Sequence, residues 1–478
     1  MQKTISFILD GQIKTIDFQK EIQLRPTTTV LNYLRSLPNH KGVKEGCAEG
    51  DCGACTVVLA EPGKNGNISY KAVNSCLIFL PMLHGRQLIT VENLKSSDGA
   101  LHPVQTGLVE KDGTQCGFCT PGMAMSIFAL YKNNSDPGPE DIKDALTGNL
   151  CRCTGYKPIA EAAAEALAHR EMDIFSLQEK ETRKLLKGIS RESIHIRTAR
   201  QDYYRPATLR QALKLRNTCP DAEVISGATD VALRVTKKFE LIKEIIDLSG
   251  IDELQDIADT RDELIVGAGV NLSDLLPTVR ESFPALYGMF TVYGSRQVRN
   301  LATLGGNLGT ASPIGDSLPV LMAYCARLML ENESGQREVS LDDYFRGYRQ
   351  TVRQPDELIT KIIIPRPANG TIFKSYKISK RKDLDISTVS AGFRLELNNG
   401  NRVSDIRLVF GGMADRVRRA DKTEGFLLGK KWSRETVEQS MEILRREFTP
   451  ISDVRGSADF RRIASRNLLL KFWSETST

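Results

Sequence analysis

Several features that this sequence of 478 residues lacks limit the classes of protein to which it can belong. No window holds about 18 uninterrupted apolar residues, which excludes a transmembrane helix. The first residues, MQKTISFILDG, carry one early lysine, but the apolar stretch stops at Asp10 and no cleavage-like tail follows, so we expect no signal peptide. The 65 Lys and Arg residues exceed the 59 Asp and Glu residues by only +6, too little to indicate a nucleic-acid partner. We therefore expect a cytoplasmic protein with no membrane and no nucleic-acid partner.

Internal repeats and low-complexity tracts are also missing, so we expect ordinary globular domains. The composition agrees, with 41% hydrophobic and 26% charged residues. A chain of this length is expected to fold into about three domains.

Cysteine is the most informative residue that the chain does contain, because eight of its ten cysteines form two sets. The first set consists of Cys47, Cys52, Cys55 and Cys76. Its C-x4-C-x2-C…C spacing is typical of plant-type [2Fe–2S] centres. Gly46, Gly50 and Gly53 allow tight turns that bring backbone N–H groups toward sulfur. A structural zinc site is the alternative, but zinc sites usually pair two C-x2-C motifs or a C-x2-C motif with histidines.

The second set consists of Cys116, Cys119, Cys151 and Cys153, in QCGFCTPG and NLCRCTG. Four thiolates are the number that a [2Fe–2S] cluster needs, two on each iron. Taken alone, C-x2-C followed by C-x-C is also compatible with zinc, but the nearby first set favours iron–sulfur. Disulfides are the least favoured interpretation, since cysteines kept free for metal binding suit a reducing compartment. The chain is therefore predicted to transfer electrons.

The first 92 residues are predicted to form a β-grasp, ferredoxin-like domain. Ile5, Phe7 and Leu9 alternate with polar residues and lead to an Asp10-Gly11 turn, which indicates a hairpin. TTVLNYLRS predicts a short helix with a threonine cap, and CTVVLA predicts a strand after the cysteine loop.

A helical domain is predicted over residues 93–170, from CTPGMAMSIFALYKN, PEDIKDAL and PIAEAAAEALAHR. Pro121 occupies a first-turn position, and the second cysteine set is expected at helix ends. Residues 171–199 are polar with little periodicity and are interpreted as a linker. Residues 200–369 alternate strand-like and helical runs, which predicts an α+β nucleotide-binding domain. Residues 370–478 predict a smaller α+β domain with two amphipathic helices.

Three glycine-containing motifs are candidates for nucleotide-binding loops. VGAGVNL is rejected as a Rossmann fingerprint, because Leu272 occupies the third glycine position. VISGATDV offers consecutive N–H groups from Gly227 to Asp230, and NLATLGGNLGTASPIGD offers Gly305 and Gly306. Successive amides of this kind form anion-binding concavities, and two of them could hold a pyrophosphate without a helix dipole. The alternative is that both are merely tight turns.

Five motifs together resemble the xanthine dehydrogenase family of molybdenum hydroxylases: GCAEGDCGACTVVL, QCGFCTPGMAMS, GNLCRCTGY, LATLGGNLGTASPIGDSLP and VFGGMA. Their order along the chain matches that family, and the resemblance spans nearly the whole sequence. It implies an α+β multidomain protein with a plant-type [2Fe–2S] domain, a helical [2Fe–2S] domain, an FAD domain of the vanillyl-alcohol oxidase (PCMH) type and a CO dehydrogenase flavoprotein-like C-terminal domain.

The resemblance also implies the FAD contacts, which are Val224, Ile225, Ser226, Gly227, Ala228, Thr229, Asp230, Val231, Tyr293, Thr303, Leu304, Gly305, Gly306, Asn307 and Asp316. KISKRKDLDIS resembles the loop beside the flavin where NAD approaches. Some relatives carry a lysine near Thr388 and this chain does not, which weakens an assignment of NAD specificity to that loop. Cys325 is interpreted as a buried structural thiol.

By the same resemblance, the chain is an electron-transfer small subunit with no catalytic residue of its own. The molybdopterin portion would need many hundreds of residues beyond Thr478, so it is expected on a separate large subunit, in a heterotetramer of two small and two large chains. Electrons from hypoxanthine or xanthine oxidation to urate would pass through the second cluster, the first cluster and FAD to NAD. The alternatives are the equivalent subunit for an aldehyde, nicotinate or carbon monoxide, a stand-alone flavin and iron–sulfur reductase, or a zinc-binding scaffold.

Overall fold

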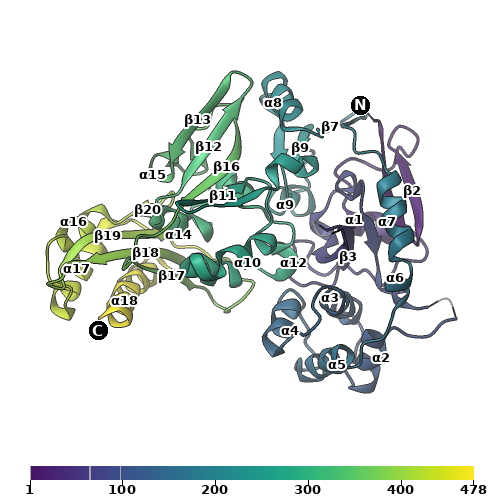
Figure 1. Cartoon of the computed structure of the whole chain (residues 1–478), viewed down its shortest axis with the longest axis horizontal. Coiled ribbons are helices and arrows are strands. Elements are labelled where there is room, and N and C mark those ends of the chain that lie inside the picture. The colour runs from purple at the N-terminus through teal and green to yellow at the C-terminus, as the bar shows by residue number, and fades with distance from the viewer. Residues whose placement is uncertain (1, 64–65, 97, 478) are drawn as a thin grey trace. The chain divides into compact units, whose positions relative to one another are not determined.

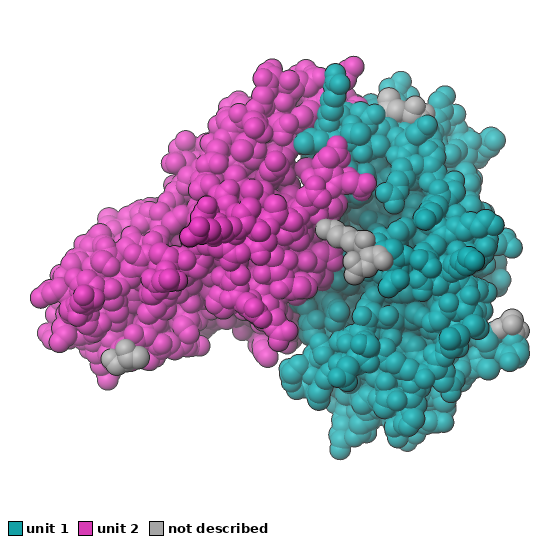
Figure 2. All heavy atoms as spheres, in the orientation of Figure 1, with its two compact units in different colours: residues 1–212, 221–251, 295–302 teal, residues 213–220, 252–294, 303–478 magenta. Residues whose placement is uncertain are grey.

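The computed structural model describes residues 2–63, 66–96 and 98–477, which form two compact units (Figures 1 and 2). Unit 1 comprises Met1–Ala212, Asp221–Ile251 and Ser295–Ala302. Unit 2 comprises Leu213–Pro220, Asp252–Gly294 and Thr303–Thr478. Helix α8 (Leu209–Thr218) contributes residues to both units.

Unit 1 begins with a five-stranded sheet in the order β2-β1-β5-β3-β4. Its strands are β1 (Thr4–Leu9), β2 (Gln12–Asp17), β3 (Thr56–Pro62), β4 (Ile68–Asn74) and β5 (Gln87–Ile89). Asp10 and Gly11 join β1 to β2 with φ of 53° and 74°, the left-handed pair that a tight two-residue hairpin turn requires. Helix α1 (Val30–Ser36) is capped by Thr29, whose side chain accepts from the Asn32 N–H. The predicted β-grasp domain is confirmed.

Four helices follow: α2 (Pro103–Glu110), α3 (Thr120–Asn133), α4 (Pro139–Leu146) and α5 (Lys157–Ala168). Pro121 lies in the first turn of α3, where its missing N–H costs no hydrogen bond. Met125 and Phe128 of α3 share one buried core with Val58 of β3 and Tyr70 of β4. The helical part therefore packs on the β-grasp sheet, and the predicted helices are confirmed.

Residues 171–199, predicted to be a linker, contain α6 (Ile174–Leu177), α7 (Glu179–Gly188) and β6 (Ile194–Arg197). Phe175, Leu186 and Ile189 of this segment are buried in the same core as α3. The sequence signal is weak because α7 is strongly polar and Leu186 is its one buried residue, so few apolar positions mark it as a packed helix. The segment is ordered and packed, while the domain boundary itself stays a prediction.

Unit 1 also contains a four-stranded sheet in the order β6-β7-β9-β8. It comprises β7 (Asp202–Arg205), β8 (Glu223–Ile225) and β9 (Glu244–Asp247), with α9 (Ala232–Thr236) and α12 (Arg296–Arg299) in the same unit. Strand β9 pairs in parallel with both β7 and β8. Ile225, Ile245 and Leu301 join a core with Ile5 and Phe7 of β1, so this sheet packs against the β-grasp domain.

Unit 2 contains a five-stranded sheet in the order β10-β11-β16-β12-β13. The strands are β10 (Ile257–Asp259), β11 (Glu263–Gly267), β12 (Arg327–Asn332), β13 (Gly335–Ser340) and β16 (Leu358–Pro365), with a small pair, β14 (Phe345–Gly347) and β15 (Gln350–Thr351). The helices are α10 (Leu272–Ser282), α11 (Pro284–Thr291), α13 (Leu304–Thr310), α14 (Ser317–Ala323) and α15 (Leu341–Tyr344). Strand β11, which ends at Gly267, pairs antiparallel on both sides. This pairing agrees with the rejection of a Rossmann unit, which needs parallel strands.

The C-terminal part of unit 2 has a sheet in the order β17-β18-β19-β20. It is formed by β17 (Ile372–Ile378), β18 (Val389–Leu397), β19 (Val403–Gly411) and β20 (Arg418–Arg419), with α16 (Asp421–Leu427), α17 (Arg434–Glu447) and α18 (Ala458–Thr476) packed beside it (Figure 1). Phe393 and Phe410 of the sheet share a core with Leu444 of α17 and Phe472 of α18. No helix in the described ranges is long and apolar enough to cross a membrane.

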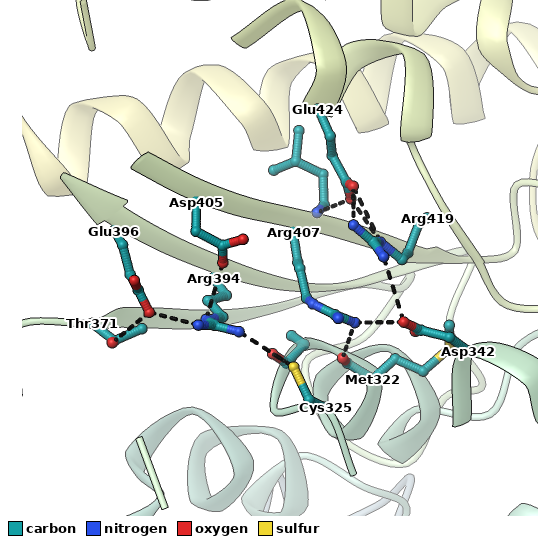
Figure 3. A network of polar contacts seen from close by, with 12 residues as sticks. Met322, Cys325, Asp342, Thr371, Arg394, Glu396, Asp405, Arg407, Arg419 and Glu424 are labelled. Carbon is teal, nitrogen blue, oxygen red and sulfur yellow. Dashed lines mark hydrogen bonds and ion pairs between the residues drawn. The ribbon is translucent and has the colours of Figure 1, made fainter. Parts of the chain in front are cut away.

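A row of ion pairs lies on this sheet (Figure 3). Arg394 pairs with Glu396 and Asp405, while Arg407 and Arg419 both reach Asp342. The Arg394 guanidinium also donates to Cys325 Sγ at 3.3 Å. The prediction that Cys325 is buried was wrong, because it is only partly buried. Its sulfur lies at the edge of a charged network rather than in an apolar core.

Candidate functional site

The four cysteines of the first set belong to unit 1 and lie in the stretch of sequence between α1 and β5. Three backbone N–H groups, those of Glu49, Asp51 and Cys52, donate to Cys47 Sγ at 3.3–3.4 Å. Gly50 and Gly53 have φ of 80° and 69°, so the turns that aim these amides use the left-handed region that glycine tolerates. The sulfurs of Cys55 and Cys76, both buried, lie 3.4 Å apart. Pairs of thiols with N–H donors aimed at sulfur suit a [2Fe–2S] cluster, which takes two thiolates on each iron.

Hydrogen bonding makes one thiol of each pair more acidic than the other. The Cys52 thiol and the backbone N–H donors lower the pKa of Cys47 to about 5. The bond to Cys47 together with burial raises the pKa of Cys52. In the other pair, the bond between the two thiols lowers the pKa of Cys55 and raises that of Cys76. Cys47 and Cys55 are therefore favoured as thiolates, the form that binds metal.

The second cysteine set also forms two pairs, Cys116 with Cys153 and Cys119 with Cys151. Cys119 is the N-cap residue of α3, at a helix end as predicted, and Cys116 precedes it. Cys151 and Cys153 lie in the loop between α4 and α5. Burial opposes ionisation of Cys151, but the Thr154 hydroxyl, 3.2 Å from its sulfur, and backbone N–H groups lower its pKa to about 7. No group of three or more His, Cys, Asp or Glu side chains surrounds a single-ion position in residues 2–63, 66–96 and 98–477.

The two cysteine loops touch each other inside unit 1. The Leu150 N–H donates to the Cys52 carbonyl at 3.0 Å, and Asn149 Nδ2 donates to the Gly53 carbonyl at 3.0 Å. A Cβ added at Gly53 would lie 2.0 Å from the Gly148 carbonyl oxygen. Only glycine permits this approach, so the two sets of thiols are held in one fixed spacing.

The first predicted FAD loop, Val224 to Val231, lies in unit 1 and leads from β8 to α9. Ser226 Oγ is buried and has no hydrogen-bond partner in the described residues, so this loop keeps a polar group for a ligand. Ala228 has φ of 59°, an uncommon conformation for alanine. Gly227 has a packing role that the sequence did not indicate, since a Cβ there would lie 1.8 Å from the Leu301 carbonyl oxygen.

The second predicted loop, Thr303 to Asn307, lies in unit 2 and is the start of helix α13. The expectation of free turn amides without a helix was wrong. Thr303 is the N-cap, and the N–H groups of Leu304, Gly305 and Gly306 donate to Val270 O, Ala268 O and Thr303 Oγ1. A Cβ at Gly305 would clash with Ala268 at 2.5 Å, whereas one at exposed Gly306 would meet only Thr303 Oγ1. Gly306 is therefore the more open of the two glycines, with only Thr303 Oγ1 close to its Cβ position.

Tyr293, Asn307 and Asp316 make polar contacts in unit 2, in two separate groups. Asn307 Nδ2 donates to the Tyr293 hydroxyl at 2.9 Å, and Ser317 Oγ donates to Asn307 Oδ1 at 2.5 Å. Asp316 is buried and forms an ion pair with Lys377 at 2.7 Å, while Ser387 Oγ donates to its other oxygen at 2.5 Å. The sequence did not single out Lys377, although it is the first residue of KISKRKDLDIS. The Asp316 carboxylate thus contacts both the first residue of this motif, Lys377, and its last residue, Ser387.

Family models match the chain in four consecutive segments. Residues 14–80 match a 2Fe-2S iron-sulfur cluster binding domain, and residues 90–164 match a [2Fe-2S] binding domain. Residues 196–367 match the FAD binding domain in molybdopterin dehydrogenase, and residues 374–476 match the CO dehydrogenase flavoprotein C-terminal domain. The two cysteine sets lie in or beside the iron–sulfur matches, and all the predicted FAD contacts lie in the third.

Curated relatives are similar over nearly the whole chain. A xanthine dehydrogenase of Emericella nidulans is 32% identical over 99% of this chain and 38% of its own length. A xanthine dehydrogenase/oxidase of Mus musculus is 33% identical over 94% of this chain and 37% of its own length. The chain thus spans less than half the length of these relatives.

Solved structures with a similar fold come from related enzymes. Carbon monoxide dehydrogenase from Hydrogenophaga pseudoflava matches with a TM-score of 0.54 and 26% identity, over 58% of this chain and 96% of that chain. Quinoline 2-oxidoreductase from Pseudomonas putida matches with a TM-score of 0.53 and 27% identity, over 59% of this chain and 99% of that chain.

Proposed function

We propose that this chain, which belongs by its four matched domains to the molybdenum hydroxylases, is the small subunit of a xanthine dehydrogenase. It would pass electrons from a molybdenum centre on a large partner subunit through two [2Fe–2S] sites to FAD and on to NAD. The heterotetramer of two small and two large chains belongs to the same proposal.

The observation that carries the proposal is the direct contact between the two cysteine loops. Eight thiols form four pairs, and the two sets are joined by the hydrogen bond from Leu150 N–H to Cys52 O. Electron relays need centres held at short, constant separations, which a backbone hydrogen bond between two ligand loops supplies. A zinc scaffold has no need of two adjacent sites with N–H groups directed at sulfur.

The proposed ligands of the first cluster are Cys47, Cys52, Cys55 and Cys76, and those of the second are Cys116, Cys119, Cys151 and Cys153. When bound, iron–sulfur clusters carry single electrons and FAD exchanges one or two, which links a one-electron relay to a hydride acceptor. The chain's own residues hold these groups. Ser226 offers a buried hydroxyl to the flavin nucleotide, and Gly306 leaves space on the outer side of α13.

The order of the two sites follows from their exposure. Cys116 and Cys153 are exposed, so the second site lies at the surface of unit 1, where a partner's centre can approach. Cys55 and Cys76 are buried, so the first site lies deeper. We therefore assign the second cluster as the entry point and the first cluster as the donor to FAD.

The second candidate function is that of the equivalent electron-transfer subunit in an enzyme that oxidises another substrate. It is suggested by the structural neighbours, which are named carbon monoxide dehydrogenase and quinoline 2-oxidoreductase. Relatives named xanthine dehydrogenase or xanthine dehydrogenase/oxidase match 94–99% of this chain, which supports its assignment as a subunit of that type of enzyme. Purification with the native partner, followed by assays of xanthine-dependent NAD reduction, tests the choice. Reduction with an aldehyde, nicotinate, quinoline or carbon monoxide but not with xanthine would overturn it.

Cofactor content of the isolated full chain tests the electron-transfer function separately. We expect iron and acid-labile sulfide in equal amounts, FAD, and no molybdenum. Stoichiometric zinc in place of iron, or FMN in place of FAD, would contradict the proposal. Xanthine alone should not reduce this chain, whereas NADH should.

A further inference from the structure

A short segment of unit 1, Ser295–Ala302, reaches both cysteine loops although it lies far from them in sequence. It contains helix α12, and its Gln297 is fully buried. Gln297 Nε2 lies within hydrogen-bonding distance of three acceptors: Ser126 Oγ at 2.8 Å, Ala145 O at 2.9 Å and Asn149 Oδ1 at 3.0 Å. All three belong to the helical domain that carries the second cysteine set.

Asn149 extends this network to the first cysteine loop. Its Nδ2 donates to Gly53 O at 3.0 Å and to Thr56 Oγ1 at 3.1 Å, while its Oδ1 accepts from Ser126 Oγ at 2.6 Å. Asn149 is itself buried and stands two residues before Cys151. Gly53 follows Cys52 directly. Two buried amides therefore bridge residues adjacent to ligands of both proposed clusters.

Close backbone packing surrounds these amides. A Cβ at Gly148 would lie 2.0 Å from Gln297 Oε1, and one at Gly122 would lie 2.2 Å from Gly53 O. At the other end of the segment, the Leu301 carbonyl oxygen fills the space beside Gly227 of the first predicted FAD loop. Within one unit, the segment thus touches the first predicted FAD loop and the second cysteine loop, and Asn149 connects it to the first cysteine loop. Because the packing around this segment is close, there is no free space that could absorb a small shift in its position.

We propose that Gln297 and Asn149 are positioning residues that set the separation and relative orientation of the two iron–sulfur clusters. They act through the loops, since neither is a proposed ligand. A buried amide that satisfies several acceptors specifies one arrangement, whereas an apolar side chain of similar size fills the volume without specifying it. The inference rests on the ligand assignment proposed above and extends it to residues outside the cysteine motifs.

The test compares Gln297→Leu with Asn300→Leu in the full chain loaded with iron. Asn300 is a matched control: it is a buried amide at the end of α12, and its Nδ2 donates to the Ala72 carbonyl of strand β4 at 2.8 Å rather than to a cysteine loop. Pulsed dipolar electron paramagnetic resonance of the reduced chain measures the coupling between the two clusters, and redox titration measures their potentials. Thermal unfolding records the structural cost of each change.

We expect Gln297→Leu to shift the dipolar splitting and the second cluster's potential, and Asn300→Leu to leave both unchanged at a similar loss of thermal stability. An unchanged dipolar splitting in Gln297→Leu would show that Gln297 is an ordinary core residue that does not position the clusters. If Gln297→Leu fails to retain iron, the same measurements are made on Ser126→Ala, which removes one member of the network without leaving a large side chain unpaired. An unchanged dipolar splitting in that variant would then contradict the proposal. A wild-type chain lacking two iron–sulfur signals would instead refute the ligand assignment.

Discussion

The backbone N–H of Leu150 donates a 3.0 Å hydrogen bond to the carbonyl oxygen of Cys52. Leu150 precedes Cys151, so this bond joins the chain beside a proposed ligand of the second cluster to a proposed ligand of the first. It links two separate loops, the glycine-rich loop before β3 and the loop that follows α4. The two sites are therefore spatially coupled, although each has its own set of cysteines.

Replacing Cys151 by Ser tests whether the sites can be separated. A hydroxyl is a poor ligand for iron compared with thiolate, so we expect the second cluster to be lost and the iron content to be halved. The first cluster should remain, because Cys55 and Cys76 lie in a core that contains no residue of the helices α2 to α5. Electron paramagnetic resonance of the reduced variant should show one [2Fe–2S] signal. Loss of both signals with FAD retained would show that the sites depend on each other.

Replacing Gly306 by Leu tests the proposed flavin site. A Cβ there would meet only Thr303 Oγ1, the N-cap oxygen of α13, at 2.8 Å, so a leucine would shift that cap contact and fill the open side proposed for the ligand. We expect loss of FAD and of reduction by NADH, with both clusters still reducible by dithionite. Gly309→Leu is the matched control, one turn later on α13, where a Cβ meets only Ile359 at 3.6 Å. Equal FAD loss in both variants would mean that helix disruption, not ligand space, is the cause.

Local signals in the sequence were sufficient for most of the fold. The Asp10-Gly11 turn and the Thr29 cap act over a few residues, and the hairpin and the helix that they predict are present. The N–H groups expected near sulfur are found at Cys47, because glycines place them there. Such features depend on backbone geometry within one loop, which sequence spacing reports directly.

Features that depend on distant contacts were not predictable from one sequence. Asp173 orders the segment read as a linker by pairing with His102, 71 residues away, and with Lys132, 41 residues away. Lys377 pairs with Asp316 across 61 residues. Gly227 is required by the backbone at Leu301, not by a turn. None of these partners is marked by local periodicity, so only the folded chain reveals them.

His84 should make the stability of unit 1 depend on pH. Its Nδ1 accepts from the Ser6 N–H at 3.0 Å and its Nε2 donates to Ser190 O at 2.7 Å, which requires the neutral ring. Burial lowers the pKa of His84 below its usual value of about 6.5. Below that value the unfolded chain binds a proton that the folded chain does not, so stability should fall as the pH drops from about 6.5 toward the lowered pKa.

The change His84→Gln should remove this part of the pH dependence and cost about 1–3 kcal/mol at pH 8 through unpaired buried groups. Chemical unfolding between about pH 8 and pH 5 measures both effects. His169→Gln is the control, because its side chain is exposed after α5 and its loss leaves no buried group unpaired. A His84→Gln profile parallel to that of the wild type would show that other groups control the acid response.

The ion pair between Asp316 and Lys377 should hold the loop over residues 379–387 in place. Both side chains are buried, and Lys377 Nζ also donates to Val292 O at 2.9 Å. Lys377→Met would leave a buried carboxylate without its counter-ion, which costs about 3–5 kcal/mol. We expect lower thermal stability and faster trypsin cleavage at Lys380, Arg381 and Lys382.

The double change Lys377→Met with Asp316→Asn supplies the control, because it removes both charges together. We expect it to recover part of the stability lost in Lys377→Met, since a neutral buried amide costs less than an unpaired carboxylate. Trypsin cleavage should stay fast, because the amide cannot replace the ion pair that anchors the loop. Cleavage at the wild-type rate in both variants would show that the hairpin between β17 and β18 positions the loop without Asp316.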